Sequence, residues 1–401
     1  MAESRPLAAD FCYPFAMTSF DLSLPAKIIF GNGCISRLGD EVKPHAQRVL
    51  LVSSGNPARI QSALDSLKAS GVLVSLAQVK GEPTLEAVRS AVRLAQTVQA
   101  QGVVAVGGGS VLDAGKAVAA MAANPGDLMD YVEVIGAGKP LPNAPIFFAA
   151  VPTTAGTGTE ATRNAVLTSK EHRLKVSLRH PLMVPKVTLL DPALTVSVPP
   201  EVTATTGMDA LCQLIEAFTC RTPNAFTDAL CREGMVRAVR SLRRAFKDGS
   251  DLAAREDMVL ASHFSGIALA NAKLGAVHGF AAPLGGMYDA AHGAICAALL
   301  PTVMTMNLRA IGEREPNHPA LARYREVAVI LTGQPGAEAK DGAAYCDVLR
   351  TELGIPRLKA LGIQWDEFYS IAEKASKASS MKGNPIELNL GELVTILGAA
   401  Y

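Results

Sequence analysis

Residues 102–118 read GVVAVGGGSVLDAGKAV, and this stretch decides the fold. Its first residues form an apolar run typical of a buried strand, glycines follow, and residues 111–123 carry apolar side chains at helical spacing. A strand that leads into a helix in this way is the repeating unit of a parallel sheet. Consecutive glycines let backbone N–H groups approach a ligand, and a helix N-terminus adds partial positive charge. The stretch therefore predicts an α/β fold whose glycine loop is either a pyrophosphate site or a tight connector.

The rest of the first half repeats this pattern, whereas the second half does not. Strands are predicted at 49–52, 73–76 and 146–151, and a helix is predicted at 82–100. Beyond the sequence SVPP at 197–200, segments rich in alanine and leucine are predicted to be helical, and they cover 201–220, 225–246, 253–270 and 365–376. The chain is therefore predicted to have an α/β N-terminal Rossmann-like domain followed by an all-α C-terminal domain.

These patterns also set the expected domain boundaries. We expect an irregular N-terminal arm at 1–18, a dinucleotide-binding α/β domain at 19–198, and a helical metal and substrate domain at 199–401. Ligands of open parallel sheets bind beyond the carboxyl ends of the strands, so a cleft between the two domains is the expected site.

A second polar loop follows the strand at 146–151. It reads VPTTAGTGTE from Val151 to Glu160, and its hydroxyl groups suit contacts to ribose, phosphate and carboxamide. Loops of this composition also cap helices without binding a ligand. In the first loop, Asp113 and Lys116 follow the glycines. Two polar loops at successive strand ends favour a nucleotide over a pair of plain turns.

Size and charge exclude several classes of protein. With 401 residues, 49% of them hydrophobic, the chain is long enough for two globular domains. The formal net charge is +1 and no long block of Lys and Arg occurs, so neither a nucleic acid nor a membrane surface is an expected partner. Apolar runs are interrupted well before the length of a membrane span.

Cysteine usage indicates a reducing compartment. The seven cysteines are odd in number, scattered and never arranged as C-x-x-C, which is typical of buried thiols rather than a disulfide framework. The first residues carry acidic side chains and lack an apolar segment of the secretory type. We therefore expect a cytoplasmic protein.

Four residues of the second half form a candidate metal site: Asp209, Gln213, His278 and His292. Asp209 and Gln213 are one helical turn apart, so both side chains project from one face. The histidines lie in AVHGFAAPLGGMYDAAHG, where the Pro-Leu-Gly-Gly sequence is predicted to form a turn. Imidazole and carboxylate suit Fe²⁺ or Zn²⁺, whereas an amide oxygen is a weaker ligand. Each residue alone could equally make local structural hydrogen bonds.

In this order, GGGSVLDAGK, VPTTAGTGTE and the set from Asp209 to His292 make the chain resemble the iron-containing (group III) alcohol dehydrogenases of the dehydroquinate synthase-like superfamily. The resemblance covers about residues 19–310 by motif. It implies an NAD(P)-dependent alcohol dehydrogenase that acts on a small or medium alcohol, aldehyde or ketone. It also implies a homodimer with NAD or NADP as cofactor and Fe²⁺ or Zn²⁺ as metal.

The resemblance also implies roles for individual residues. Gly108, Gly109 and Ser110 would hold the pyrophosphate, and Lys175 would lie near the nicotinamide ribose. Asp209, His278 and His292 match three metal ligands, and Gln213 stands at the fourth ligand position, which is normally histidine; His278, His292 and Gln213 would also act in catalysis. The full expected cofactor set is Ser54, Gly55, Gly107, Gly108, Gly109, Ser110, Asp113, Thr153, Thr154, Thr157 and Lys175.

Two further departures from the family pattern bear on chemistry. Ala282 stands where many members carry a second histidine near the nicotinamide, so one acid/base candidate is missing. The strand at 49–52 ends in SSGNPAR without the acidic residue that NAD-preferring members often place near the adenosine ribose. With Arg59 nearby, we expect NADP to be tolerated, and a preference for NADP is left open; Arg59 could equally be a solvated residue at the start of a helix.

The sequence leaves competing accounts of the chemistry. In the first account, the metal polarises the substrate oxygen while hydride passes to or from nicotinamide. In the second, the metal is absent, and hydrogen bonds from His278, His292 and Gln213 polarise the substrate oxygen, as in the metal-independent maleylacetate reductases. A non-redox enzyme of the dehydroquinate synthase type, or a nucleotide-binding protein without activity, is a further alternative. The retained ligands favour the first account. The non-redox alternative rests on a basic cluster, which comprises Arg163, Arg173, Arg179 and His180.

Overall fold

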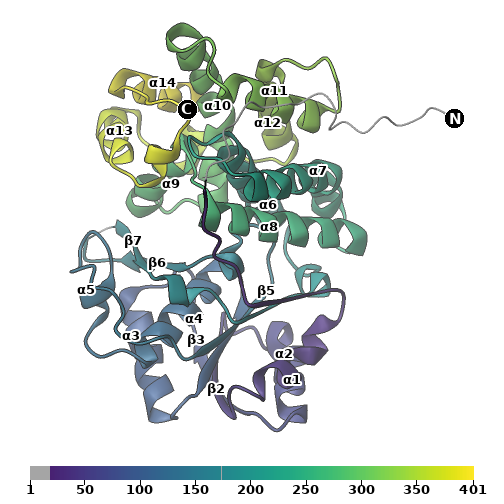
Figure 1. Ribbon diagram of the computed structural model, residues 1–401, viewed down its shortest axis with the longest axis vertical. Helices are drawn as coiled ribbons and strands as arrows, with labels where there is room; N and C mark the ends of the chain where they lie inside the picture. The colour runs from purple at the N-terminus through teal and green to yellow at the C-terminus, as the bar shows by residue number, and fades with distance from the viewer. Residues whose placement is uncertain (1–18, 173) are drawn as a thin grey trace, which may run out of the picture.

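The computed structural model describes residues 19–172 and 174–401. Two domains are stacked along its longest axis, the α/β domain at one end and the helical domain at the other (Figure 1). The first described residues lie against the helical domain, where Ser23 exchanges hydrogen bonds with Asn271, and the chain then enters the α/β domain (Figure 1). The predicted boundary between residues 198 and 199 lies just before the first long helix of the helical domain, α6 (Pro200–Thr219). The predicted arm at 1–18 lies outside the described residues.

The α/β domain is built on a six-stranded sheet in the order β1-β8-β5-β4-β2-β3, in which every pair of neighbours is parallel. The predicted parallel sheet is therefore confirmed. The strand bounds are β1 (Lys27–Phe30), β2 (Arg48–Ser53), β3 (Leu73–Gln78), β4 (Gly102–Gly107), β5 (Phe147–Pro152) and β8 (Val187–Leu190). Every residue of β4 is buried because strands and helices surround it, which explains its continuous apolar sequence.

Helices cover both faces of this sheet. They are α1 (Leu38–Val42), α2 (Pro57–Ala69), α3 (Leu85–Thr97), α4 (Gly109–Ala122) and α5 (Leu128–Tyr131). Alternate residues of the strands point to opposite faces: Val103 packs in one apolar cluster with residues of α3 and α4, and Val104 packs in another with residues of α1 and α2. The order of the strands reverses between β2 and β4, and open α/β sheets bind ligands at such a reversal.

A two-stranded antiparallel hairpin, β6 (Asn164–Ser169) and β7 (Leu174–Arg179), follows the second polar loop. The sequence patterns did not predict it, and they also did not predict β1 and β8. Short strands with charged residues at alternate positions, such as Lys175 and Arg179 in β7, give a weak signal. The hairpin brings Lys175 to the side of the sheet that faces the helical domain, where it lines the cleft between the domains.

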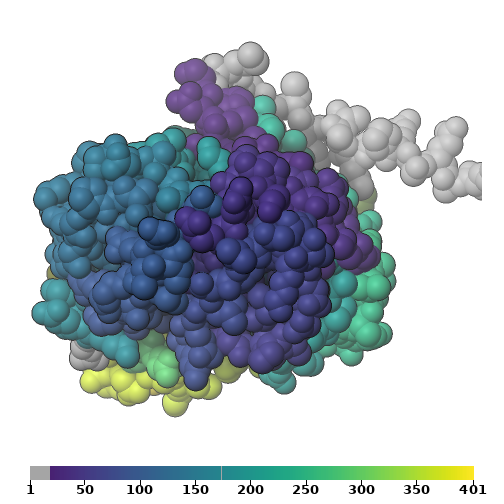
Figure 2. All heavy atoms as spheres, turned by 90° about the horizontal axis from the view of Figure 1, so that it is seen from below, coloured from purple at the N-terminus to yellow at the C-terminus, as the bar shows by residue number. Residues whose placement is uncertain are grey.

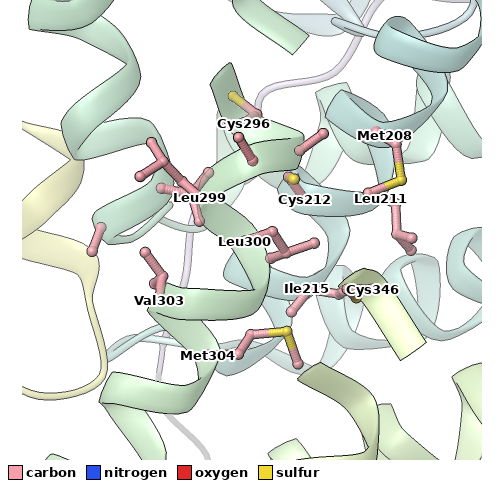
Figure 3. Close-up of a cluster of buried hydrophobic side chains, with 14 of the residues drawn as sticks. Met208, Leu211, Cys212, Ile215, Cys296, Leu299, Leu300, Val303, Met304 and Cys346 are labelled. Carbon is pink, nitrogen blue, oxygen red and sulfur yellow. The ribbon is translucent and has the colours of Figure 1, made fainter. Parts of the chain in front are cut away.

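The helical domain consists of α6 and eight further helices. Their bounds are α7 (Ala225–Lys247), α8 (Leu252–Asn271), α9 (Ala276–Met287), α10 (His292–Arg314), α11 (Ala320–Thr332), α12 (Ala339–Glu352), α13 (Phe368–Ser376) and α14 (Leu390–Ala400). Figure 3 shows α6 and α10 packed through an apolar cluster that includes Leu211, Ile215 and Leu300. The predicted all-α domain is confirmed.

One helix, α10, is long and apolar enough to cross a bilayer by length and composition alone, and 78% of its apolar window is buried inside the molecule. Its apolar side chains contact the other helices of the domain, which is how a core helix packs. Figure 2, seen from the end of the α/β domain, shows purple and blue residues over most of this face, with the green and yellow helical domain at the rim. The two domains therefore lie one behind the other in this direction.

Some local predictions were wrong. The Pro-Leu-Gly-Gly sequence is not a turn, because Pro283 lies inside α9. Val277, Phe280 and Leu284 of α9 are fully buried, and this packing outweighs the hydrogen bond that proline removes from the helix. The predicted helix at 365–376 begins with a 3-10 turn, Trp365–Glu367, and becomes α13 only at Phe368.

Candidate active site

A cleft of about 510 Å³ lies between the domains. From the α/β domain it is lined by the glycine loop, the second polar loop and the β6–β7 hairpin; from the helical domain it is lined by α6, the end of α8, α9 and the start of α10. Of the predicted site residues, it brings together Gly109, Ser110, Asp113, Thr157, Lys175, Asp209, Gln213, His278 and His292. Both halves of the predicted site therefore face one cavity.

The candidate metal ligands converge on Asp209. Its Oδ1 atom lies 3.3 Å from Nε2 of His278 and 3.7 Å from Nε2 of His292. Oδ1 is buried, and no donor among the described residues makes a hydrogen bond of good geometry to it. A buried carboxylate oxygen without a donor is costly unless a cation satisfies it. The residues present therefore fit a divalent metal ion.

Three helices bring these side chains together. Asp209 projects from the middle of α6, His278 lies in the first turn of α9, and His292 is the first residue of α10. Met208 and Leu211, on either side of Asp209 in α6, belong to the apolar cluster that also contains residues of α9 and α10 (Figure 3). The cluster is thus fixed by the core of the helical domain.

Glu216, which the sequence analysis missed, orients His278. Its Oε2 atom lies 2.6 Å from Nδ1 of His278, and Oε1 accepts a 2.7 Å hydrogen bond from the backbone N–H of Val277. An ionised carboxylate only accepts, so Nδ1 of His278 carries a proton, and Nε2 is the nitrogen left to bind a metal ion beside Asp209. A carboxylate behind a histidine is the usual support of a metal ligand. Glu216 lies two helical turns after Asp209, and that spacing was the available signal.

Gln213 lies beside the cluster, with its amide already engaged. Its Nε2 atom donates to Oδ2 of Asp209 over 3.4 Å, and its Oε1 atom accepts from the Ser265 hydroxyl over 2.8 Å. A carboxylate offers only acceptors, so the amide must turn its N–H side toward Asp209. Gln213 therefore fixes the second oxygen of that carboxylate.

Cys296 is a second residue that the sequence analysis missed. It follows His292 by one turn of α10 and is fully buried. Its sulfur lies 3.7 Å from Nε2 of His292 and 3.9 Å from Nε2 of His278. One ligand atom from each of Asp209, His278, His292 and Cys296 can be chosen so that all four lie within 4.8 Å of one another.

The electrostatics of the cluster favour a positive charge at its centre. Burial raises the pKa of Asp209, but His292 and His278 outweigh this effect and hold the pKa of the carboxyl below its usual value. Burial lowers the pKa of His278, yet Cys296, Asp209 and Glu216 together raise that pKa well above the usual value. Groups that stabilise an imidazolium in this way also stabilise a bound cation.

The glycine loop and the second polar loop lie against each other. Thr153 donates its backbone N–H to the carbonyl of Gly107 over 2.9 Å. A Cβ atom at Gly108 would lie 3.2 Å from Oγ1 of Thr154, and one at Gly109 would lie 2.8 Å from Oγ1 of Thr157. The absence of side chains at these glycines lets the two loops approach, with the N-terminus of α4 open toward the cleft.

Lys116 joins the two loops and has no capacity left for a ligand. Its ammonium donates to the carbonyls of Thr159, Thr162 and Asn164 and to the Thr162 hydroxyl, over 2.8 to 2.9 Å. Burial raises the pKa of the neighbouring Asp113 and lowers the pKa of Lys116. The hydrogen bonds of Lys116 therefore join α4 to the loop after β5.

The other predicted cofactor residues surround this core. Ser54 and Gly55 follow β2, the neighbour of β4 in the sheet, at the reversal of strand order, and they do not line the cleft. Lys175 reaches from β7 toward α9 and pairs with Glu82 over 3.2 Å, although Glu82 is about half exposed. Ion pairs of this exposure contribute little, so the Lys175 ammonium is available to a ligand in the cleft.

Ala282 lines the cleft, and so do Arg163 and Arg179 of the predicted basic cluster. Arg179 pairs with Glu133 over 3.2 Å. His180 instead caps a 3-10 turn by accepting from the backbone N–H of Leu182, and Arg173 lies outside the described residues. Of the three basic residues of this cluster that the structure describes, Arg163 and Arg179 therefore face the cleft, whereas the His180 ring is engaged in the 3-10 turn.

We expect Glu216→Gln to lower metal affinity about 10-fold to 100-fold, the usual effect of losing a residue that supports a ligand. The amide would present its N–H to Nδ1 of His278, which moves the imidazole proton to Nε2 and blocks the lone pair that faces Asp209. Competition with a fluorescent zinc chelator measures the affinity. Asp257→Asn is a matched control, because Asp257 is also buried and its partners, Arg237, Arg240 and Ser241, lie outside the cluster. Equal affinities in both variants would remove Glu216 from this role.

Comparison with known proteins matches both domains of the chain to one family of enzymes. Residues 25–192 match the family described as iron-containing alcohol dehydrogenase, and residues 203–401 match the C-terminal part of that family. The chain is 35% identical to 1,3-propanediol dehydrogenase of Klebsiella pneumoniae, covering 95% of this chain and 99% of the relative. It is 34% identical to choline dehydrogenase of Bacillus subtilis (strain 168), covering 91% of each. Among solved structures, alcohol dehydrogenase from Oenococcus oeni superposes with a TM-score of 0.88 at 33% identity, covering 96% of this chain and all of that one.

Proposed function

The chain belongs to the iron-containing alcohol dehydrogenase family, whose members are oxidoreductases that act on CH–OH groups. On this basis we propose that the reacting carbon of its substrate lies beside Asp209, His278 and His292. The main observation behind this proposal is that one cleft is lined both by this cluster and by the glycine loop. Hydride would pass between nicotinamide and a small or medium alcohol, aldehyde or ketone. The relatives' names, propanediol and choline dehydrogenase, support a short substrate with a second polar group.

Asp209, His278 and His292 would hold the metal, which we propose to be Fe²⁺ or Zn²⁺. Bound there, the ion would supply Lewis-acid polarisation of the substrate oxygen. The protein's own part is to keep Asp209 ionised, to keep the Nε2 lone pair of His278 directed at the same point through Glu216, and to bury both groups from water. Preorganised groups of this kind need no rearrangement during the reaction.

Gly109, Ser110 and Thr157 would bind the pyrophosphate, and Lys175 would contact the nicotinamide end of the cofactor. The open N-terminus of α4 supports the first assignment, and the position of Lys175 near Gly285 of α9 supports the second. Thr153, Thr154, Gly107 and Gly108 would shape the loops around the cofactor rather than line the cleft itself. Because Ala282 offers no titratable group, the alcohol proton would leave through water in the cleft.

The proposal is tested by following the absorbance of reduced nicotinamide with a panel of diols, amino alcohols and their aldehydes. Steady net oxidation or reduction of the cofactor that depends on added substrate supports it. Cofactor binding without turnover across the whole panel, in protein loaded with Fe²⁺ and separately with Zn²⁺, would contradict it.

Cofactor choice gives a further prediction. The loop that begins at Ser54, after β2, contains no acidic residue up to Arg59. Both NADH and NADPH should therefore act as cofactors. Ser54→Asp is expected to raise the preference for NADH over NADPH at least about 10-fold, because a carboxylate repels a 2′-phosphate and accepts from a 2′-hydroxyl. The ratio of the two kcat/KM values measures the effect. An unchanged ratio would mean that the adenosine ribose does not reach the end of β2.

We also propose a homodimer in the cytoplasm. The described cysteines are all buried and unpaired, which agrees with a reducing compartment. Light scattering coupled to gel filtration measures the mass of the assembly, and a monomer at micromolar concentration would contradict the first part.

A further inference from the structure

We propose that Cys296 rather than Gln213 supplies the fourth protein ligand, so that the metal is held by one carboxylate, two imidazoles and one thiolate. The proposal rests on the metal dependence proposed above. It names a residue, Cys296, that was not among the metal ligands predicted from the sequence. It concerns which atom completes the set around Asp209.

Spacing is the first argument. In a tetrahedral site, zinc lies about 2.0–2.2 Å from nitrogen and oxygen ligands and about 2.3 Å from sulfur, so neighbouring ligand atoms stand about 3.3–3.6 Å apart. Oδ1 of Asp209 lies 3.3 Å from Nε2 of His278 and 3.7 Å from Nε2 of His292. The Cys296 sulfur lies 3.9 Å and 3.7 Å from the same two nitrogens. These four distances are within a few tenths of an ångström of the expected spacing, and all four ligand atoms lie within 4.8 Å of one another.

The environment of Cys296 differs from that of the other buried thiols of this core. Figure 3 shows its sulfur directed away from the apolar cluster, whereas Cys212 and Cys346 lie among apolar side chains. Burial raises the pKa of Cys346 to about 12 and raises the pKa of Cys212 well above its usual value, so both remain neutral. Cys296 instead faces two imidazoles, which are the groups that a metal-bound thiolate would have as neighbours.

Gln213 supplies the complementary argument. Its amide nitrogen faces Asp209, and its amide oxygen faces Ser265. An N–H group has no lone pair for a cation, and turning the amide over would set its oxygen against Oδ2 of the Asp209 carboxylate. Gln213 therefore serves the site by holding the second oxygen of Asp209. Cys296 of α10 takes over the role of fourth metal ligand that the family assigns to a histidine at position 213.

The exchange changes the chemistry of the site. One carboxylate and one thiolate together neutralise a divalent ion, whereas one carboxylate and three imidazoles leave a net positive charge. Thiolate is a softer ligand than imidazole, so Zn²⁺ should be favoured over harder ions such as Mn²⁺ or Mg²⁺. When the ion binds, the S–H bond of Cys296 breaks, a sulfur–metal bond forms, and the proton leaves to solvent.

Cobalt(II) is the probe that reads the ligand directly, because a thiolate bound to it gives a charge-transfer absorption in the near ultraviolet that nitrogen and oxygen ligands do not give. The full chain, freed of metal and loaded with one equivalent of Co²⁺, should show this band. Cys296→Ser should lose it, and its affinity for Zn²⁺ should fall more than about 100-fold, which exceeds the usual effect of losing an outer partner. Cys346→Ser, a matched buried cysteine of the same core, and Gln213→Ala should keep the band.

The possible outcomes separate the two proposals. Bound cobalt without a thiolate band, or a band that Cys296→Ser retains, would overturn the assignment of Cys296 and leave metal-dependent function standing. A protein that binds neither Co²⁺ nor Zn²⁺ would overturn both. Should Cys296→Ser fold poorly by circular dichroism, proton release decides instead: zinc added to the metal-free protein in weak buffer should release one proton more from the unaltered chain than from a Cys296→Ala variant. Equal release would contradict the proposal.

Discussion

Replacing Asp209 with asparagine should remove the bound metal and lower kcat/KM at least about 1,000-fold, which corresponds to the several kcal/mol that a Lewis acid supplies. Asp209 is the carboxylate on which His278, His292 and Cys296 converge, and its buried Oδ1 has no hydrogen-bond donor of good geometry among the described residues. Asparagine keeps the size and removes the negative charge. Elemental analysis of the purified variant and the absorbance of reduced nicotinamide measure the two effects.

The same variant separates the proposed mechanism from that of a metal-independent reductase. If hydrogen bonds from the histidines polarised the substrate, an amide at position 209 would weaken turnover only modestly, because the imidazoles would remain. Full metal loss with activity within about 10-fold of the unaltered enzyme would therefore contradict metal-dependent chemistry. Asp257→Asn again provides the control for a buried carboxylate outside the cluster.

Replacing Gly158 with alanine should lower the free energy of unfolding by about 3 kcal/mol or more. Gly158 has φ +60°, and a Cβ atom there would lie 2.4 Å from Cα of Gly266 and 2.6 Å from the carbonyl oxygen of Ser262. Both contacts are to the backbone of α8, which cannot rotate away as a side chain can. Overpacking costs about 1–3 kcal/mol, and the left-handed conformation adds about 1 kcal/mol for alanine. Urea denaturation measures the change.

Gly138→Ala is the matched control for this prediction. Gly138 has nearly the same φ, +59°, but a Cβ atom there would meet nothing within 4 Å. It should lose only the conformational part, about 1 kcal/mol. Equal losses in the two variants would show that the close approach between the second polar loop and α8 contributes nothing. The reciprocal change, Gly266→Ala, should resemble Gly158→Ala, since its Cβ atom would lie 2.1 Å from the carbonyl oxygen of Gly158.

The sequence predicted those parts of the fold whose signal is local. The apolar run at 102–106, the glycines after it and the helical segments at 201–220, 225–246 and 253–270 each carry their structure in their own spacing and were found, whereas α10, α11, α12 and α14 were not named. The strand β7 was missed because its apolar residues alternate with Lys175, Ser177 and Arg179, and the edge strand β1 was missed because it has only four residues. The continuation of α9 through Pro283 depends on its burial, which no local pattern reveals.

The site was predictable to the extent that ligands share a helix or follow a motif. Asp209 and Gln213 were found together because one turn separates them, and the histidines were found through the family pattern. Cys296 was read only as one of several scattered thiols, since its neighbourhood with His278 arises from the packing of α9 beside α10. Glu216 was passed over for the same reason: its role depends on where the first turn of α9 lies.

The fastening of the two loops by Lys116 bears on how the protein responds to dissolved ions. Its four hydrogen bonds lie in a buried site, so mobile salt ions do not reach them and should screen them little. The pair between Lys175 and Glu82 is open to solvent on the glutamate side and is screened. As ionic strength rises, the two loops joined by Lys116 should therefore keep their arrangement while the pair between Lys175 and Glu82 weakens. Salt should then alter the end of the cleft proposed for the nicotinamide more than the end proposed for the pyrophosphate.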